Sequence, residues 1–290
     1  MLRADRTVAH PEARESAAEA VGYTGAGERE LADMNSLSVC IIAQNEEENL
    51  PRVVRSAGGI ADEVVVVDGG STDRTQEIAR ELGATVYFRA FTNHADQKNY
   101  AASLASNDWI LLLDADEELS PELRNSLLEW KRRGAEFAVY EMARLTWYLG
   151  AWIRRSRWYP DYQRRLYRRD RTKFSGVIHS ALDYEGRTGR LQGDMLHYTI
   201  RTFPEHEAKL EKYTTAIAKE MFDRGERSWR GAMWVAAPWS WFRHFILGAG
   251  FLDGHRGALI AQMAARGVWL KYRKLGELVQ AEAKSRDGAK

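Results

Sequence analysis

The sequence predicts an α/β fold, in which a mostly parallel sheet is flanked by helices and followed by a C-terminal helical extension. Three observations predict it. Short apolar runs rich in Val, Ile and Leu recur in the first half of the chain, as expected for strands buried on both faces of a parallel sheet. Helix-like stretches separate these runs, which is the alternation of consecutive β-helix units. The last third combines an amphipathic stretch with many aromatic residues.

Four strands are expected in the first half, and each of the first two leads into residues suited to a helix start. Asn45 can cap the helix after the first strand, and Pro51 falls early enough in that helix to be tolerated. Two glycines permit a tight turn after the second strand, where Ser71, Thr72 or Asp73 can cap the next helix. The strands are expected at residues 37–43, 63–67, 84–88 and 109–113, with a further helix at 94–105.

The second half of the chain is less regular. We expect strands at residues 136–147 and 163–167, an amphipathic helix at 203–224, and one or two aromatic-rich helices within 229–272. Charged residues interrupt the apolar stretches, so none approaches the roughly 18 apolar residues of a membrane-spanning helix. The first 33 residues lack the apolar core of a secretory signal, and we expect residues 1–34 to be a disordered extension, with Met34 as an alternative start.

Charge and cysteine content narrow the class of protein. The formal net charge is only +1, yet nine Lys and Arg stand against two Asp between Gly150 and Ser175, which suits an anionic ligand. A solvated loop is the alternative interpretation of this segment. Cys40 is the only cysteine, so neither a disulfide framework nor a cysteine-based zinc site can form, and a reducing compartment fits.

Three aspartates directly follow predicted buried strands, where an unpaired carboxylate would be costly without a partner or a metal. Asp114 and Asp116 lie two residues apart, so both can turn toward one Mg²⁺ or Mn²⁺ that also binds diphosphate oxygens. Asp68 precedes Gly69 and Gly70, which let a base or ribose approach a carboxylate that accepts hydrogen bonds. The alternatives are an ordinary turn for the pair and a helix cap for Asp68.

Two other nucleotide-binding signatures are absent from the sequence. The turn after the first strand has no G-x-G-x-x-G, and no G-x-x-x-x-G-K-[ST] occurs anywhere in the chain. Dinucleotide-dependent dehydrogenases and P-loop enzymes are therefore poor fits.

Four motifs in order resemble glycosyltransferase family 2, whose fold is the Rossmann-like GT-A type. They are Ile41-Ile42-Ala43-Gln44-Asn45-Glu46-Glu47, Val66-Val67-Asp68-Gly69-Gly70-Ser71-Thr72-Asp73, Gln97-Lys98-Asn99-Tyr100-Ala101 and Leu113-Asp114-Ala115-Asp116-Glu117. Three more resemble the lipopolysaccharide-core β-1,4-glucosyltransferase branch, namely Trp158-Tyr159-Pro160-Asp161-Tyr162-Gln163-Arg164-Arg165-Leu166-Tyr167, Phe174-Ser175-Gly176 and Gly250-Phe251-Leu252-Asp253-Gly254. The resemblance implies a GT-A catalytic domain at residues 35–200 and a helical extension at 201–290.

The resemblance also implies roles for individual residues. Lys98 would face the diphosphate, Asp114 would reach the ribose or the metal, and Asp116 would hold the metal. Because such enzymes invert the anomeric centre in one displacement, a single general base must take the proton of the acceptor hydroxyl. The base and ribose pocket would be lined by Ala43, Gln44, Asn45, Glu46 and Asp68.

Asp161 is the candidate general base, because it follows a turn-forming proline among aromatic residues and arginines. Those arginines offer an alternative, since an ion pair would lower the pKa of Asp161 and weaken it as a base. Glu117 and Asp183 are held in reserve. His179 is a candidate metal or phosphate ligand, with a structural hydrogen-bonding role as the alternative. Ser180 stands where relatives commonly carry Glu after that His, which leaves the acceptor open.

The aromatic residues of the C-terminal tail are interleaved with Arg and Lys, which is typical of a helix that lies in a membrane interface. The alternative is a helical cap buried on the catalytic domain. A lipid-linked acceptor would account for both this tail and the basic segment at residues 150–175.

Together these features predict an inverting, metal-dependent transferase that uses Mg²⁺ or Mn²⁺. It would move a hexose, with glucose favoured, from a UDP-sugar to a lipid-linked saccharide such as the lipopolysaccharide inner core. We expect a cytoplasmic protein, peripheral on the inner membrane, without a nucleic-acid partner. The open alternatives are another UDP-sugar, a polyprenyl-phosphate acceptor, or a non-catalytic scaffold that binds sugar nucleotides or membranes.

Overall fold

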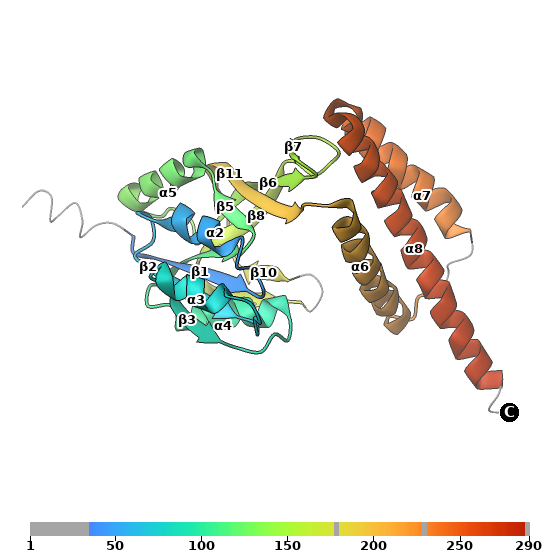
Figure 1. Ribbon diagram of the computed structural model, residues 1–290, viewed down its shortest axis with the longest axis horizontal. Coiled ribbons are helices and arrows are strands. Elements are labelled where there is room, and N and C mark those ends of the chain that lie inside the picture. The colour runs from blue at the N-terminus through green and yellow to red at the C-terminus, as the bar shows by residue number, and fades with distance from the viewer. Residues whose placement is uncertain (1–34, 177–179, 228–230, 288–290) are drawn as a thin grey trace, which may run out of the picture.

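The computed structural model describes residues 35–176, 180–227 and 231–287. The predicted extension at residues 1–34 and the candidate ligand His179 lie outside these ranges. Figure 1 shows an α/β body built on one large sheet, with a group of long helices beside it. The α/β fold and the helical C-terminal part predicted from the sequence are both confirmed.

Parallel strands form the N-terminal half of the sheet, in the order β3-β2-β1-β4. Val39 and Ile41 pack into one apolar core and Cys40 into another, because alternate side chains of a strand point to opposite faces. All three side chains are fully buried, which explains why this strand shows no polar alternation. The strands are β1 (Leu37–Ala43), β2 (Glu63–Asp68), β3 (Thr85–Phe88) and β4 (Trp109–Asp114).

The helices between these strands are α2 (Leu50–Ala57), α3 (Thr75–Glu81) and α4 (His94–Leu104). The prediction that Asn45 caps the first helix is wrong, because α2 begins only at Leu50 and Asn45 adopts a left-handed conformation with φ of 56°. The Asn45 side chain instead accepts a hydrogen bond from the backbone N–H of Thr72, at 2.8 Å. The two loops at the ends of β1 and β2 are thereby joined.

The second half of the sheet mixes strand directions. β8 (Asp161–Arg168) lies between β4 and β6 (Val139–Tyr148) and is antiparallel to both. Because β8 runs opposite to β4, its first residues lie at the carboxyl end of β4, beside the predicted aspartates. β11 (Thr188–Ile200) continues the sheet parallel to β6, and β5 (Glu117–Leu119) pairs antiparallel with β11.

Smaller elements complete the α/β body. The helix α5 (Pro121–Arg133) packs against β11, and β7 (Ala151–Ile153) pairs with β6. The short helix η1 (Arg169–Arg171) leads into a two-stranded sheet of β9 (Thr172–Ser175) and β10 (Ala181–Tyr184).

The C-terminal part consists of α6 (Phe203–Asp223), α7 (Ala232–Phe242) and α8 (Gly254–Asp287), with η2 (Arg243–Leu247) and η3 (Gly250–Asp253) between the last two. The helix α8 packs against both α6 and α7, and α7 lies on the side farther from the sheet (Figure 1). Within the described ranges, no helix has both the length and the apolar character needed to cross a bilayer.

Candidate active site

The loops after β1 and β2 form one connected wall at the carboxyl edge of the parallel strands. The backbone N–H of Asn45 donates to Ser71 Oγ at 2.8 Å, and the N–H of Glu46 donates to Thr75 Oγ1 at the same distance. Ala43 is buried, whereas Gln44 and Asn45 are exposed. The structure therefore brings the predicted nucleotide-binding residues 43–46 together with the loop that follows Asp68.

Asp68 is fully buried, and its own loop occupies its carboxylate. Its Oδ2 accepts hydrogen bonds from the backbone N–H groups of Gly70 and Ser71, both at 3.0 Å, and from Gln76 Nε2 at 2.8 Å. In the structure, this carboxylate holds its own loop in shape. That role resembles the alternative interpretation, in which Asp68 caps the following helix. Its contact with a base or ribose stays a prediction.

Six charged side chains form a chain of alternating sign beside these loops. Lys98 Nζ lies 3.6 Å from Asp114 Oδ1, and Arg165 Nη2 lies 2.6 Å from both Asp114 Oδ2 and Glu117 Oε1. Arg144 Nη1 lies 3.6 Å from Glu117 Oε1, and Arg144 Nη2 lies 2.6 Å from Asp161 Oδ2. The order along the chain is Lys98, Asp114, Arg165, Glu117, Arg144 and Asp161.

Burial and charge act in opposite directions within this chain. Burial alone would raise the pKa of Asp114, but Arg165 and then Lys98 outweigh it and hold that pKa far below its ordinary value. Burial raises the pKa of Glu117 despite the neighbouring Arg165, and burial followed by the charge of Arg165 lowers the pKa of Lys98. Asp114 is therefore an ionised carboxylate that two cations already neutralise.

Asp116 faces a histidine that the sequence analysis did not select. His197 Nε2 lies 3.2 Å from Asp116 Oδ2, because the antiparallel register of β11 and β5 places His197 opposite Glu117. Burial would raise the pKa of Asp116, but the hydrogen bond from His197 outweighs it and lowers that pKa. Asp116 is therefore ionised at neutral pH, with an imidazole beside it.

Asp116 lines a cavity of about 370 Å³ between the α/β body and the start of the C-terminal helices. The loop from Asn45 to Asn49 forms one side of it, and the end of β11 with the start of α6 forms another. Lys209 of α6 lines the cavity, and its Nζ lies 3.0 Å from Glu205 Oε1. An ionised carboxylate and an ammonium group thus line one cavity, and the imidazole of His197 lies beside that carboxylate.

The candidate bases lie away from this cavity or in ion pairs. Asp161 begins β8, is 38% exposed, and accepts hydrogen bonds from Arg144 and, at 2.8 Å, from Gln163 Nε2. It is held in an ion pair, as the alternative interpretation anticipates. Glu117 is buried within the charged chain, and Asp183 is exposed on β10.

A divalent cation would need ligands from both protein and substrate at this site. Among the described residues, no group of three or more His, Cys, Asp or Glu side chains is arranged to hold a metal ion. Mg²⁺ commonly takes only one or two carboxylates and completes its shell with phosphate oxygens and water. Asp116 with His197 fits that mode, and the buried Oδ1 of Asp114 has no hydrogen-bond partner.

Four residues at the site were not selected as candidates from the sequence: Arg144, Arg165, His197 and Lys209. A buried cation beside an apolar run, as in Arg165-Leu166, is a usable signal, because an unpaired buried charge is costly. Lys209 carries no such local signal, because only the packing of α6 brings it to the cavity.

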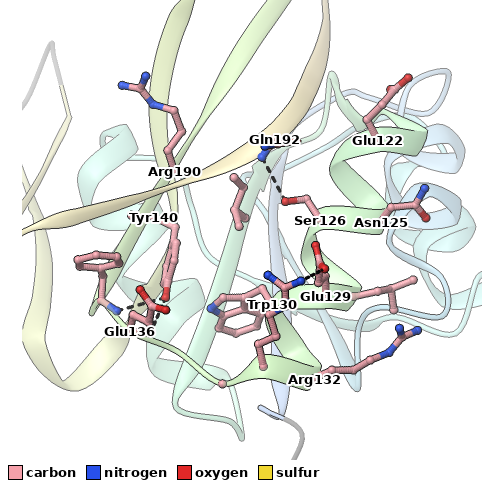
Figure 2. A pocket seen from close by; sticks show the side chains of 16 residues that line it. Glu122, Asn125, Ser126, Glu129, Trp130, Arg132, Glu136, Tyr140, Arg190 and Gln192 are labelled. Atoms are coloured by element: carbon pink, nitrogen blue, oxygen red, sulfur yellow. Dashed lines mark hydrogen bonds and ion pairs between the residues drawn. The ribbon is translucent and has the colours of Figure 1, made fainter.

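A larger cavity, about 650 Å³, lies near the amino-terminal ends of β4 and β6 (Figure 2). Trp130 and Tyr140 form part of its wall, and Trp130 also stacks edge-on with Trp109 at the start of β4. Arg133 pairs with Glu129, and Arg190 pairs with Glu141. These charged groups satisfy one another, and the predicted site residues lie at the other end of the sheet.

The chain is similar in sequence to known glycosyltransferases. The family model described as glycosyl transferase family 2 matches residues 38–182. A protein of Rickettsia typhi named an uncharacterized glycosyltransferase is 30% identical over 259 residues, which cover 84% of this chain and 88% of the relative. The lipopolysaccharide core biosynthesis glycosyltransferase LpsC of Rhizobium meliloti is 27% identical over 251 residues, which cover 81% of this chain and 93% of that protein.

Among solved structures, a glucosyl-3-phosphoglycerate synthase from Mycobacterium tuberculosis is similar to part of the chain. It was crystallised with Mn²⁺, UDP-glucose and phosphoglyceric acid. The match has 24% identity and a TM-score of 0.35, and it covers 42% of this chain and 48% of the synthase.

Proposed function

The chain belongs to glycosyltransferase family 2, and we propose that it transfers a hexose, with glucose favoured, from a UDP-sugar to a lipid-linked saccharide. The observation that carries the proposal is Asp116, which pairs with His197 and lines a cavity walled by the predicted nucleotide-binding loop. The relative named for lipopolysaccharide core biosynthesis aligns with most of both chains and supports an acceptor in the lipopolysaccharide core.

The donor would lie across the loops after β1 and β2. We propose that Ala43, Gln44, Asn45, Glu46 and Asp68 shape the base and ribose pocket. Asp116 and His197 would hold Mg²⁺ or Mn²⁺, with Asp114 beside them and Lys98 near the diphosphate. When bound, such a cation would stabilise the charge on the departing nucleoside diphosphate as a Lewis acid. His179, outside the described ranges, remains a proposed ligand.

Asp161 is the proposed general base of a single inverting displacement. Its carboxylate would exchange one of its two hydrogen bonds from Arg144 for one from the acceptor hydroxyl and take that proton. The acceptor oxygen would form its bond to the anomeric carbon as the bond from that carbon to the diphosphate oxygen breaks. Arg144 would stay beside both Glu117 and the protonated Asp161, and so orient the base.

We place the reaction at the cytoplasmic face of the inner membrane, with the protein bound peripherally. A nucleotide sugar is water-soluble whereas the proposed acceptor is anchored in lipid, so the enzyme must work where the two meet. The basic segment at residues 150–175 suits an acceptor rich in phosphate.

A donor panel tests this function. UDP-glucose, UDP-galactose and UDP-N-acetylglucosamine would be assayed for UDP release with Mn²⁺, Mg²⁺ or EDTA, using truncated lipopolysaccharide or polyprenyl phosphate as acceptor. We expect acceptor-dependent release, greatest from UDP-glucose, that EDTA and Asp116→Asn both abolish. Asp223→Asn is the matched control, because Asp223 is exposed at the last residue of α6 and lies outside both the cavity and the basic segment.

The panel also separates the alternatives. Preferential release from another UDP-sugar, or with polyprenyl phosphate, would replace the favoured donor or acceptor and leave the transferase intact. Absence of release from every UDP-sugar with either metal would reject the transferase and favour a scaffold that only binds sugar nucleotides or membranes.

A further inference from the structure

A broad apolar surface lies on the C-terminal helices, outside the candidate active site. Met233, Ala237 and Ser240 form the buried side of α7, which packs against α8. The opposite side of α7 and the η2–η3 segment remain open. We call this surface the aromatic face; its members that are more than half exposed are Trp234, Val235, Trp239, Leu247, Phe251 and Leu252.

The exposure of these side chains is unusually high for their type. Trp234 is 73% exposed, Val235 74% and Leu252 63%. Contiguous apolar surface of this kind on a protein marks an interaction site, because leaving it in water is unfavourable. The aromatic face therefore needs a partner that accepts large apolar side chains.

Three arginines border the aromatic face. Arg154, Arg155 and Arg157 are exposed in the segment between β7 and β8, and we call them the basic turn. Arg154 lies over the ring of Tyr159, and Arg155 bonds to a backbone oxygen. None of the three forms an ion pair with a carboxylate in the part of the chain that the structure describes. Their charges are therefore available to an anionic partner.

Two hydrogen bonds fix the basic turn against the aromatic face. The backbone N–H of Ser156, a fully buried residue, donates to the carbonyl oxygen of Gly248 at 2.8 Å. Its Oγ donates to Asp253 Oδ2 at 2.9 Å. Gly248 and Asp253 flank the segment that carries Phe251 and Leu252. Segments far apart in sequence thus present arginines and apolar side chains together, where the β7 end of the body meets the junction of α7 and α8 (Figure 1).

We propose that the aromatic face and the basic turn together dock the protein on an anionic lipid bilayer. Tryptophan, phenylalanine and leucine side chains enter the headgroup region, and the arginines bind lipid phosphates. The charge of this surface is complementary to an anionic bilayer, because residues 231–252 and 149–160 contain no Asp or Glu.

A second copy of the chain fits this surface less well than lipid does. A twofold dimer would bury the aromatic face against itself and bring the basic turns of both copies to one interface. No acidic residue of these two segments would be present to pair with the arginines. Anionic headgroups supply the missing negative charge over the whole surface.

Docking in this orientation would also place the acceptor near the active site, an inference that rests on the proposed function. β8 begins with Asp161, directly after the segment that carries the basic turn. A bilayer held at the basic turn would therefore bring a lipid-linked acceptor to the side of the molecule where Asp161 and Arg144 lie.

Vesicle flotation with the full chain tests the proposal, in the absence of donor and acceptor. Vesicles of phosphatidylcholine alone are compared with vesicles that also contain phosphatidylglycerol. We expect binding only to the anionic vesicles, and a loss of about tenfold or more with Trp234→Ser/Trp239→Ser and with Arg154→Glu/Arg155→Glu. Leu278→Ser and Arg132→Glu/Arg133→Glu are the matched controls, because these residues are exposed elsewhere on α8 and α5 and should leave binding unchanged.

Circular dichroism and thermal unfolding show whether each variant is folded, and sedimentation velocity gives its oligomeric state. Equal binding by the wild type and both double variants would overturn the proposal. It would also be overturned by a dimer that Trp234→Ser/Trp239→Ser dissociates and that does not float with anionic vesicles. Failure of UDP release with vesicle binding intact would reject the transferase and leave this inference standing.

Discussion

Asp114 and Asp116 lie two residues apart and have different surroundings. Asp114 is neutralised by Arg165 and Lys98, whereas Asp116 pairs with the imidazole of His197. A divalent cation approaching Asp114 would be repelled by these two buried cations. We therefore propose that Asp116 makes the main metal contact and that Asp114 shapes the site.

His197 gives this assignment its first test. If His197 and Asp116 hold the cation together, His197→Ala should raise the Mn²⁺ concentration needed for half-maximal UDP binding by about tenfold to a hundredfold. Isothermal titration of UDP at a series of Mn²⁺ concentrations measures this. The exposed His255→Ala is the control and should behave as wild type. An unchanged Mn²⁺ requirement in His197→Ala would assign His197 a structural role only.

The lowered pKa of Asp114 predicts that the folded protein loses stability in acid. Its pKa in the folded protein lies far below its ordinary value of 3.8, so the unfolded chain binds a proton more readily than the folded one. The stabilisation is therefore complete above about pH 4 and is lost as the pH falls toward the folded pKa. Asp114→Asn should lower the free energy of unfolding at pH 7 by about 3 kcal/mol, because Arg165 keeps only Glu117.

Urea unfolding at pH 7 and at successive steps down to about pH 3 checks this sign. The difference in unfolding free energy between wild type and Asp114→Asn should shrink as the pH falls. A difference that stays constant over this range would show that the ion pair with Arg165 does not contribute to stability.

Among whole elements, the positions of the strands in the sequence were predictable, but the pairing of strands from distant parts of the chain was not. β1, β2 and β4 follow from local apolar runs, because burial on both faces of a parallel sheet leaves a pattern within one segment. The position of Arg165 beside Asp114 depends on the register that pairs Leu111 of β4 with Leu166 of β8. No local pattern encodes a register between segments this far apart.

The same limit applies to His197, which reaches Asp116 only through the pairing of β11 with β5. Local reasoning also failed at Asn45. The residue is a good cap by type, but hydrogen bonds to the loop after β2 hold it in a left-handed conformation, and α2 begins later. The aspartates themselves were identified because their position after a buried strand is visible in the sequence.

The close contact between η3 and α8 helps to shape the aromatic face. Adding one methyl group to a glycine of α8 tests how much this contact contributes to stability. A Cβ at Gly257 would overlap the backbone carbonyl of Gly250, which cannot move away as a flexible side chain can. Gly257→Ala should therefore lower the free energy of unfolding by about 1–3 kcal/mol, as overpacking typically does. Thermal or urea unfolding measures the change.

Gly267→Ala in the same helix is the matched control. A Cβ there would meet mainly the end of the Leu210 side chain, which can adjust, and alanine favours a helix over glycine by about 1 kcal/mol. We expect a neutral or stabilising effect. Equal destabilisation by the two substitutions would mean that loss of a helical glycine, not the contact with Gly250, is responsible.

At the scale of the whole molecule, the helical extension completes the candidate donor cavity. Arg201 bonds to Asn49 at 2.6 Å and pairs with Glu48, so the start of α6 is tied to the loop after β1. Lys209 then faces the same cavity as Asp116. We therefore propose separate tasks for two sides of the extension: α6 would meet the donor, and the aromatic face would meet the bilayer.

Lys209 tests whether the extension takes part in donor binding. Replacing it with Met keeps much of the aliphatic stem and removes the charge that would meet the diphosphate, so UDP affinity should fall by about tenfold, the effect of a charge-assisted hydrogen bond of roughly 1.5 kcal/mol. Lys219→Met, exposed farther along α6, should have no effect on UDP affinity. Titration of both variants with UDP and Mn²⁺ gives the comparison. Lys209 lies outside the aromatic face and the basic turn, so Lys209→Met should bind anionic vesicles as the wild type does. If vesicle binding is lost as well, the substitution has displaced α6. The fall in UDP affinity would then reflect altered packing and not the loss of a contact with the diphosphate.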